Sequence, residues 1–167
     1  IKLTISSDVS AAALQALNGI KGAVAVYNYK TGEVLCMVSS PTFDPLNIPS
    51  DIETNSAYEG VYLNNALSST YTPGSIFKVI TAAAAIENIP DLNSRTFHCS
   101  GSTIINGEKI TCDSVNGDIS FKNGLAQSCN VVFAELAVEL GKDTMTKYAD
   151  QLGCNTNFYL DGNPNKM

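Results

Sequence analysis

The sequence predicts a mixed α and β chain in which one β-hairpin is followed by a mainly helical region. Two strand-like runs, residues 22–29 (GAVAVYNY) and 33–40 (EVLCMVSS), are joined by Lys-Thr-Gly, and glycine at such a turn is typical of a hairpin. Two apolar stretches of helical composition come later, at residues 75–87 (SIFKVITAAAAIE) and 131–140 (VVFAELAVEL). With 167 residues, the chain has the length of one domain or the greater part of one.

In the first half of the chain, helices and turns are predicted from the residues that typically begin and end them. Residues 8–17 (DVSAAALQAL) predict a helix, with Ser7 or Asp8 as the N-cap and Asn18-Gly19 as the stop. Residues 41–60 contain three prolines and predict an irregular, turn-rich segment. The helix over residues 75–87 is apolar nearly all round, which is typical of a buried helix.

In the later part of the chain, residues 88–116 predict an irregular stretch with two candidate short strands, at Ile104-Ile105 and Lys109-Ile110. The helix that begins at Val131 should end at Gly141, because glycine commonly terminates a helix. Asp143 then caps a second helix, which runs to Leu152 and is closed by Gly153.

Composition limits the class of protein. Hydrophobic residues make up 44% of the chain and charged residues 16%, so a core can form and wholesale disorder is not expected. The net charge of −6 and the ten scattered Lys and Arg residues argue against nucleic acid as a partner. The apolar stretches fall short of the roughly 18 residues of a spanning helix, and the start at Ile1 shows no secretory leader. We therefore expect any membrane anchor or export signal to lie outside this sequence.

The five cysteines are Cys36, Cys99, Cys112, Cys129 and Cys154. Cys99 and Cys112 flank a Gly-containing loop and could pair across it, but the odd count leaves at least one thiol free. There is no CxxC pair, so a zinc knuckle is not expected, and no cofactor is predicted.

The strongest local signal for chemistry is the segment YTPGSIFK, which ends at Lys78. Pro73-Gly74 interrupts the chain, so Ser75 falls in the first turn of the apolar helix, and Lys78 lies three residues later on the same face. A serine hydroxyl needs a base to become a nucleophile, and lysine serves only in its neutral form, which burial favours. The alternative is that Ser75 merely caps the helix and Lys78 reaches into solvent.

A second signal is Ser128-Cys-Asn130, directly before the helix at Val131. A hydroxyl and an amide two residues apart in a turn can relay a proton and hold a substrate carbonyl or amide. The alternative is an ordinary helix N-cap. Ser114-Val-Asn116 has the same pattern but leads to Gly117 without a helix behind it, so we prefer the Ser128 triplet.

Together these segments resemble the penicillin-binding protein family, closest to its high-molecular-weight, monofunctional class B transpeptidases, whose signature includes Ser-x-x-Lys, a Ser-x-Asn type motif and Lys-Thr-Gly. Leu3-Thr-Ile, the KTGEVL and SPTFDP segments of residues 22–45, Asn65-Ala66 and the segment QSCNVVF from Gln127 are also similar. The 53-residue separation of Ser75 and Ser128 is similar as well. The resemblance covers nearly the whole chain.

The resemblance implies an α+β fold of the serine β-lactamase and D,D-peptidase type, with residues 1–167 forming part of a transpeptidase domain. The early Lys-Thr-Gly of residues 30–32 matches the family's hairpin turn, so we assign it no catalytic role. No later copy occurs before Met167, so the resemblance implies that the third-motif strand lies outside this sequence and that this chain alone could be inactive. The uncovered hairpin would then favour self-association of the chain.

The implied activity is serine acyl transfer on D-alanyl-D-alanine ends of peptidoglycan stem peptides, at the extracytoplasmic face of the bacterial membrane. Ser75 is implied as nucleophile, Lys78 as base, Ser128 as proton relay to the leaving amine and Asn130 as the group that orients Lys78 and the substrate. β-Lactams would acylate Ser75. Two alternatives are a class D-like β-lactamase and a non-catalytic β-lactam sensor or peptidoglycan-binding module.

Overall fold

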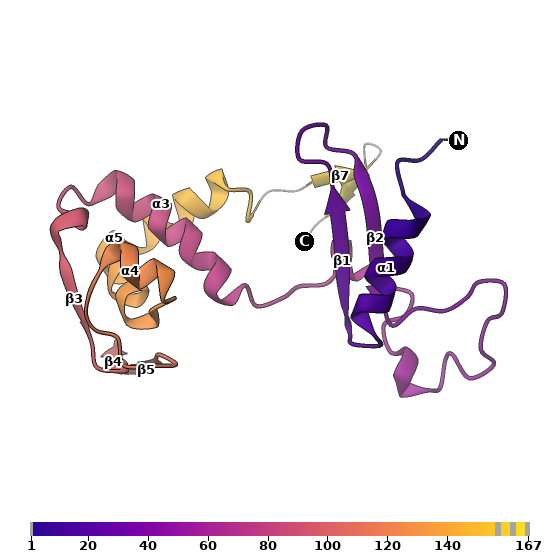
Figure 1. Cartoon of the computed structure of the whole chain (residues 1–167), viewed down its shortest axis with the longest axis horizontal. Coiled ribbons are helices and arrows are strands. Elements are labelled where there is room, and N and C mark those ends of the chain that lie inside the picture. Colours follow the sequence, from indigo (N-terminus) through magenta and orange to yellow (C-terminus); the bar gives the residue numbers. More distant parts are fainter. Residues whose placement is uncertain (1, 156–157, 161–162, 166–167) are drawn as a thin grey trace. The chain divides into compact units, whose positions relative to one another are not determined.

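The computed structural model describes residues 2–155, 158–160 and 163–165 (Figure 1). It divides into two compact units, of which unit 1 comprises Ile1–Tyr71 with Asn157–Met167 and unit 2 comprises Thr72–Thr156. Within the described residues, no helix is both long enough and apolar enough to span a membrane. Each unit contains both helices and strands, which confirms the predicted mixed class.

Unit 1 is built on the predicted hairpin. Strand β1 (Gly22–Tyr27) pairs antiparallel with β2 (Val34–Ser40), and the register shifts between Val26 and Tyr27. Gly32, in the turn, has a φ of 77°, a left-handed value that glycine adopts without a steric penalty. The Lys-Thr-Gly of residues 30–32 is therefore a hairpin turn, as predicted. Two further short strands, β7 (Phe158–Leu160) and β8 (Asn163–Asn165), also pair antiparallel.

Helix α1 (Ser7–Leu17) packs on the hairpin, mainly against β2. The prediction of Ser7 or Asp8 as its N-cap is wrong, because both already lie in the first helical turn. Ser6 instead has the extended backbone that a capping residue needs, and its hydroxyl accepts the N–H of Val9 at 3.4 Å. The predicted stop is confirmed at Asn18, which is left-handed with a φ of 45°.

The segment from the end of β2 to Tyr71 is mostly turns, as the prolines of residues 41–60 predicted for its first part. It contains one short 3₁₀ helix, η1 (Ser56–Tyr58), and one short helix, α2 (Asn65–Ser68), which is capped by Asn64. Asn65 holds α2 against the end of β2, because its N–H donates to Ser39 Oγ at 2.8 Å and its side-chain amide donates to Ser40 O at 3.2 Å.

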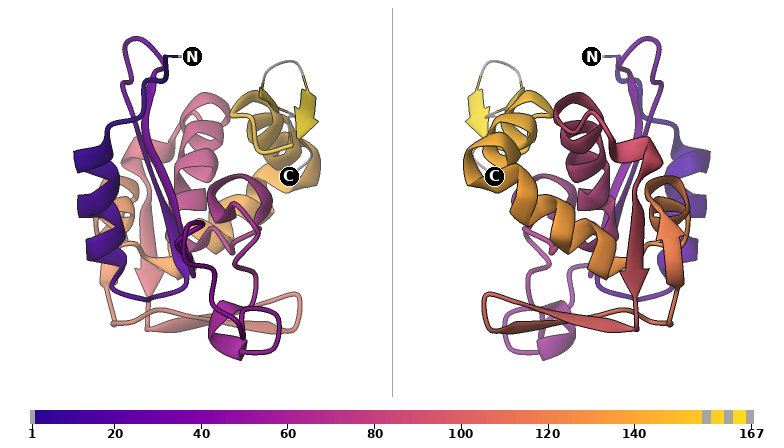
Figure 2. Two further views of the ribbon diagram at one scale, coloured as in Figure 1. Left: turned by 90° about the vertical axis from the view of Figure 1, so that its right-hand side faces the viewer. Right: turned by 90° about the vertical axis from the view of Figure 1, so that its left-hand side faces the viewer.

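Unit 2 is organised around two helices that pack against each other, α3 (Lys78–Asn88) and α5 (Asn130–Gln151) (Figures 1 and 2). A short 3₁₀ turn, η2 (Gly74–Phe77), precedes α3, and α4 (Phe121–Ala126) precedes α5. Gly141 interrupts α5 with a φ of 74° and a ψ of 166°. The sequence therefore predicted correctly that one helix ends at Gly141 and that another follows.

Two small antiparallel pairs complete unit 2, together with a 3₁₀ turn, η3 (Leu92–Ser94). Strand β4 (Ser102–Ile105) pairs with β5 (Glu108–Thr111), which confirms the two short strands expected there. Strand β3 (Thr96–Cys99) pairs with β6 (Gly117–Ser120), although the sequence predicted an irregular backbone for the first of these.

The core of unit 2 lies between α3, α5 and these strands. One prediction about it is wrong, because α3 is not buried all round. Val79 and Ile86 are 61% and 64% exposed, since α3 packs on α5 along one side only. The larger core cluster consists of buried residues from α5 and from segments that pack near it: Ala82, Ala85, Ile89, Leu92, Phe97, Cys99, Ile119, Phe121, Cys129, Val131, Val132, Phe133 and Leu136.

Candidate active site

Ser75 lies at the start of the helical segment, as predicted. Pro73 is the last residue before the 3₁₀ turn, and Gly74, its first residue, has a left-handed φ of 55°. The helical turn therefore begins abruptly at this point. Ser75 is exposed in the 3₁₀ turn η2, whereas Lys78 opens α3 and is only 9% exposed. The Lys78 amine lies 3.3 Å from Ser75 Oγ, which confirms that the two groups meet across one turn.

The Lys78 amine also reaches the second predicted motif. Its Nζ atom lies 2.6 Å from the carbonyl oxygen of Ser128, 2.9 Å from Ser128 Oγ and 2.5 Å from Asn130 Oδ1. The ring centroid of the buried Phe133 is 5.8 Å from the same nitrogen. The structure therefore brings together all four of the predicted site residues, around one nitrogen atom.

These contacts fix how the amine can exchange a proton. The carbonyl oxygen of Ser128 and the Oδ1 atom of Asn130 only accept hydrogen bonds, so they take two N–H groups of Lys78. The remaining position on nitrogen faces the hydroxyls of Ser75 and Ser128. That position is a lone pair in the neutral amine and a third N–H in the ammonium. The amine thus keeps one orientation in both states and exchanges its proton with a hydroxyl.

The two hydroxyls also contact each other, since Ser128 Oγ lies 2.8 Å from Ser75 Oγ. Ser75 Oγ, Lys78 Nζ and Ser128 Oγ therefore form a closed triangle with sides of 2.8, 2.9 and 3.3 Å. Every side is within reach of a direct proton transfer after small adjustments. A proton that leaves Ser75 can reach either of the other two atoms.

The turn that carries Ser128 is held by the end of α4. The N–H of Ser128 donates to Leu125 O at 3.0 Å, and the N–H of Cys129 donates to Gly124 O at 2.8 Å. Ser128 has a φ of 52°, which is left-handed and costs a non-glycine residue of the order of 1 kcal/mol. This backbone turns both the carbonyl and the hydroxyl of Ser128 toward the Lys78 amine.

Asn130 is oriented by residues that the sequence motifs did not reveal. Its Nδ2 atom donates to Thr111 O at 2.7 Å, at the end of β5, which leaves Oδ1 to accept from Lys78. The Sγ atom of Cys112 accepts the N–H groups of Asn130 at 3.2 Å and of Val131 at 3.4 Å. No short motif marks Thr111 or Cys112, because their role depends on the packing of β5 near the start of α5.

Three cysteines cluster at this turn as free thiols, and one of them, Cys129, belongs to the turn itself. Cys112 Sγ is 3.6 Å from Cys99 Sγ and 3.7 Å from Cys129 Sγ, so Cys99 and Cys112, which the sequence suggested could pair, lie close together across the loop but are not bonded to each other. Burial raises the pKa of the Cys112 thiol. Burial also acts to raise the pKa of Cys99, but N–H donors at Asn116 and Gly101 and the neighbouring thiols outweigh it and lower this pKa to about 6.

The rival triplet does not contribute to this arrangement. Ser114 Oγ donates to Asn116 Oδ1 at 3.2 Å, and Asn116 Nδ2 lies 3.5 Å from Cys99 Sγ. The hydrogen bonds of these two side chains thus stay within the loop and its neighbouring strand, and the preference for the Ser128 triplet agrees with the geometry.

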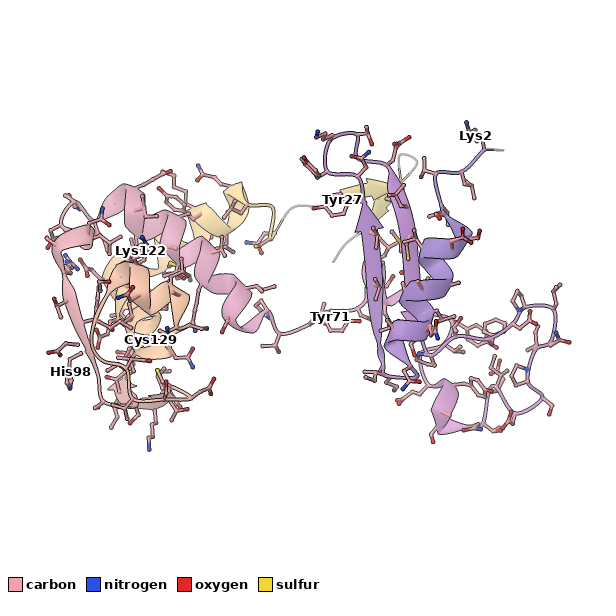
Figure 3. The ribbon with its side chains drawn as sticks, viewed as in Figure 1. Lys2, Tyr27, Tyr71, His98, Lys122 and Cys129 are labelled. Carbon is pink, nitrogen blue, oxygen red and sulfur yellow. The ribbon has the colours of Figure 1, made fainter. Side chains whose placement is uncertain are left out.

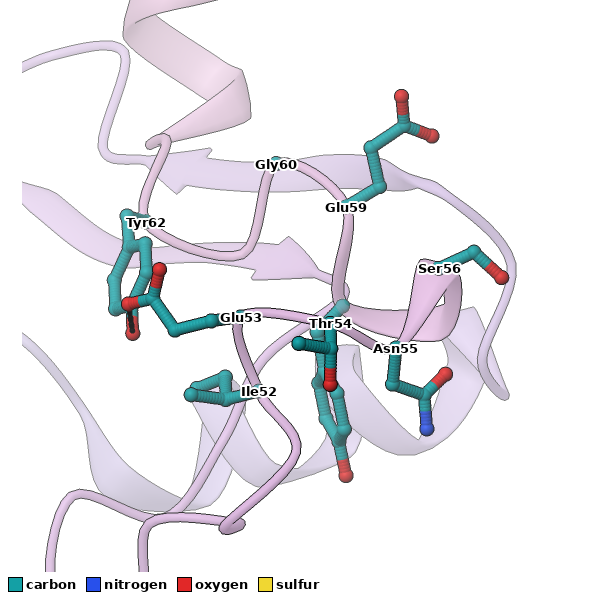
Figure 4. A pocket seen from close by; sticks show the side chains of 9 residues that line it. Ile52, Glu53, Thr54, Asn55, Ser56, Glu59, Gly60 and Tyr62 are labelled. Carbon is teal, nitrogen blue, oxygen red and sulfur yellow. Dashed lines mark hydrogen bonds between the residues drawn. The ribbon is translucent and has the colours of Figure 1, made fainter.

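Unit 1 has a surface pocket of its own, shown in Figure 4. Tyr62 donates its hydroxyl to Glu53 Oε1 at 3.3 Å on one wall. None of the four predicted site residues lines this pocket, and its wall lacks lysine, histidine and cysteine. Its lining residues are Ile52, Glu53, Thr54, Asn55, Ser56, Tyr58, Glu59, Gly60 and Tyr62.

Comparison with known proteins identifies the family of the chain. Residues 22–164 match the family model described as penicillin binding protein transpeptidase domain. Over 93% of its length the chain is 32% identical to the peptidoglycan D,D-transpeptidase PbpA of Mycolicibacterium smegmatis, covering 36% of that protein. The chain therefore belongs to the penicillin-binding protein transpeptidase family.

Solved structures give the same result. The D,D-transpeptidase domain of a peptidoglycan glycosyltransferase from Eggerthella lenta matches 89% of the chain with a TM-score of 0.79 and 31% identity, over 37% of that structure. The penicillin G acyl-enzyme complex of penicillin-binding protein A from Mycobacterium tuberculosis matches 90% of the chain with a TM-score of 0.74 and 27% identity, over 39% of that structure. The α+β transpeptidase fold is thus confirmed. The chain spans 24% to 36% of the lengths of the first curated relatives that it matches.

Proposed function

We propose that this chain carries the acylation site of a serine-type peptidoglycan D,D-transpeptidase. The observation that supports this most directly is the triangle formed by Ser75 Oγ, Lys78 Nζ and Ser128 Oγ, with sides of 2.8 to 3.3 Å. An exposed hydroxyl in contact with a buried amine and a second hydroxyl has the parts needed to form and break an ester. The family and the names of the relatives point to the same chemistry.

In the proposed acylation step, Ser75 Oγ attacks the carbonyl carbon of the bond between the two terminal D-alanines of a stem peptide. Lys78, in its neutral form, takes the hydroxyl proton as the C–O bond forms. The backbone N–H of Ser75 is one donor to the oxyanion of the tetrahedral intermediate. The positive charge on Lys78 is then surrounded by oxygens that can all accept its N–H groups.

The intermediate collapses when the C–N bond breaks and the leaving D-alanine amine receives a proton. Ser128 is proposed to deliver it and to take the proton of the Lys78 ammonium in exchange, which returns Lys78 to its neutral form, since the Ser128 hydroxyl contacts both Ser75 Oγ and Lys78 Nζ. Asn130 orients Lys78 through Oδ1, and it is proposed to orient the substrate amide as well. The amine of a second stem peptide then attacks the ester carbonyl, the bond to Ser75 Oγ breaks as the new amide forms, and the proton lost by the amine restores the Ser75 hydroxyl.

The proposed partners follow from the relatives. The relative from Mycolicibacterium smegmatis is named as a peptidoglycan D,D-transpeptidase, and the structure from Mycobacterium tuberculosis is an acyl-enzyme complex with penicillin G. We infer that peptidoglycan stem peptides and β-lactams both acylate Ser75 and that the site works at the extracytoplasmic face of the bacterial membrane. Self-association of the 167-residue chain is also proposed. Sedimentation would show it as a molecular mass that rises with concentration, and a constant monomer mass would contradict it.

Labelling with a fluorescent penicillin tests the proposed function in the whole gene product. We expect one covalent label per chain in the wild type and no label in Ser75→Ala. Ser68→Ala, in the short helix α2, is a matched control that should label normally. Equal labelling of Ser75→Ala and the wild type would reject the assignment of the nucleophile.

Turnover separates the two enzymatic alternatives. A transpeptidase should open one chromogenic cephalosporin per chain in a burst and then stop, whereas a β-lactamase should continue to turn over. Cross-linking of stem peptides should accompany the burst. A stable penicillin adduct without any cross-linking would instead favour a β-lactam sensor.

A further inference from the structure

We propose that Cys99, Cys112 and Cys129 form a binding site for one thiophilic metal ion, for which Zn²⁺ is the probe, at the Ser128–Asn130 turn. Their three sulfur atoms all lie within 4.8 Å of one another. They come from three separate segments, because Cys99 ends β3, Cys112 follows β5 and Cys129 is the N-cap of α5. This inference concerns the thiols alone and does not depend on the proposed transpeptidase activity.

The spacing of the sulfurs suits a tetrahedral ion. A Zn–S bond of about 2.3 Å in tetrahedral geometry places two sulfurs about 3.8 Å apart. Cys112 Sγ is 3.6 Å from Cys99 Sγ and 3.7 Å from Cys129 Sγ, so two of the three required separations are already close to this value. The third separation, between Cys99 Sγ and Cys129 Sγ, is no more than 4.8 Å.

The surroundings provide hydrogen-bond donors to the sulfurs. Cys112 Sγ accepts the backbone N–H groups of Asn130 and Val131 at 3.2 and 3.4 Å. The side-chain amide of Asn116 lies 3.5 Å from Cys99 Sγ. Donors of this kind stabilise the negative charge of thiolate ligands and orient them, as outer-shell groups do around metal sites. Thiolate sulfur is also the ligand type that Zn²⁺ and Cu⁺ favour over harder ions.

Burial and access are also compatible with a metal site. Cys99 and Cys129 are 0% and 1% exposed, whereas Cys112 is partly exposed and offers a path for the ion. Cys129, labelled in Figure 3, precedes the first residue of α5. Three protein ligands leave a fourth position on a tetrahedral ion, which water could occupy. Binding of Zn²⁺ releases the remaining thiol protons to solvent.

Such an ion would stiffen the catalytic turn. It would join the end of β3, the end of β5 and the start of α5 through one centre, and Asn130 is already held by Thr111 and Cys112. Because Asn130 Oδ1 is one of the contacts of the Lys78 amine, the metal would restrict the position of that amine. Lys78 and Asn130 would therefore be linked to the thiols without either being a metal ligand.

The test uses the whole gene product, reduced and freed of metal, and measures zinc uptake by equilibrium dialysis and Co²⁺ binding by its sulfur-to-metal charge-transfer absorption. We expect one ion per chain and a rise in the melting temperature. Cys112→Ser should weaken binding by at least about 100-fold and remove the absorption, since the central ligand is lost. Cys36→Ser, buried in β2, and Cys154→Ser, exposed after α5, are matched controls that should bind normally.

Three results would overturn the proposal. One is a reduced wild-type protein that takes up no Zn²⁺ although circular dichroism shows that both it and the Cys36→Ser control are folded under the conditions of the dialysis. Another is zinc uptake that survives both Cys112→Ser and Cys99→Ser. The third is a protein in which Cys112 is found only in a disulfide after purification with a reductant, because a disulfide sulfur is no longer available to the ion.

Discussion

Two triplets in unit 2 have the same Ser-x-Asn pattern but different surroundings. In residues 128–130 the serine and the asparagine both contact the Lys78 amine. In residues 114–116 the serine contacts the asparagine of its own triplet, and the asparagine contacts Cys99. The difference comes from the element next to each triplet, since α5 begins at Asn130 and packs on α3, whereas the short strand β6 begins after Asn116. Contact with a second helix, rather than the pattern itself, defines the site.

The largest expected effect comes from removing the Lys78 amine, which the 128–130 triplet contacts and the 114–116 triplet does not. Lys78→Met keeps an unbranched apolar chain in the buried position but deletes the amine. We expect the rate of acylation by penicillin to fall by about 10³-fold or more, because both hydroxyls lose their base. Lys122→Met, in α4, is the matched control and should acylate at the wild-type rate. Stopped-flow measurement of acylation decides, and a loss of less than about tenfold would contradict the role of Lys78.

The two serines should differ sharply. Ser128→Ala removes the hydroxyl that contacts both Ser75 and Lys78, and we expect acylation to slow by about 10²-fold or more. Ser114→Ala should change the rate by less than about twofold, since its hydroxyl contacts only Asn116. Equal rates for the two variants would remove the basis of the comparison.

Substitution of the two asparagines should differ in its effect on stability as well as on the acylation rate. Asn130→Ala leaves an N–H of Lys78 and the carbonyl of Thr111 without their partner, so it should lower both the acylation rate and the free energy of unfolding, the latter by about 1–3 kcal/mol. Asn116→Ala should lower the free energy of unfolding by no more than about 1 kcal/mol and leave acylation unchanged. Urea denaturation and acylation rates, measured on the same samples, check both expectations.

The smallest expected effect is on the pKa of His98, in the strand pair beside the 114–116 loop. His98 in β3 lies opposite Asp118 in β6, with Nδ1 and Oδ1 2.7 Å apart, and the hydrogen bond and charge of Asp118 raise the pKa of His98. Because this pKa is higher in the folded state, the pair stabilises the fold fully below about pH 6.5, the ordinary histidine value. The contribution disappears as the pH rises through the folded-state pKa.

Asp118→Asn should therefore return the pKa of His98 toward its ordinary value, as followed by NMR titration of the imidazole. Acylation at neutral pH should not change, because neither residue contacts the four site residues. An unchanged pKa of His98 in this variant would show that another group causes the shift.

Local sequence patterns predicted most elements and all four residues that meet at the amine. The hairpin, the break at Gly141 and the Ser75–Lys78 spacing are local features, because each depends on residues within a few positions of one another. Thr111 and Cys112 could not be found in this way, since they meet Asn130 only through the folding of β5 onto the start of α5. The exposure of Val79 was also missed, because composition indicates that a helix is apolar but not which of its sides has a partner.

The left-handed backbone of Ser128 has a consequence for how the site can change state. One residue supplies two of the four oxygens around the Lys78 nitrogen, one from its main chain and one from its side chain. A simple rotation about the side-chain bond of Ser128 would move its hydroxyl but would leave the carbonyl in place. Movement of Ser128 alone can therefore break both contacts only if its peptide unit rotates. Such a step is a movement of the main chain, with the rate of a loop rearrangement rather than that of a rotamer change.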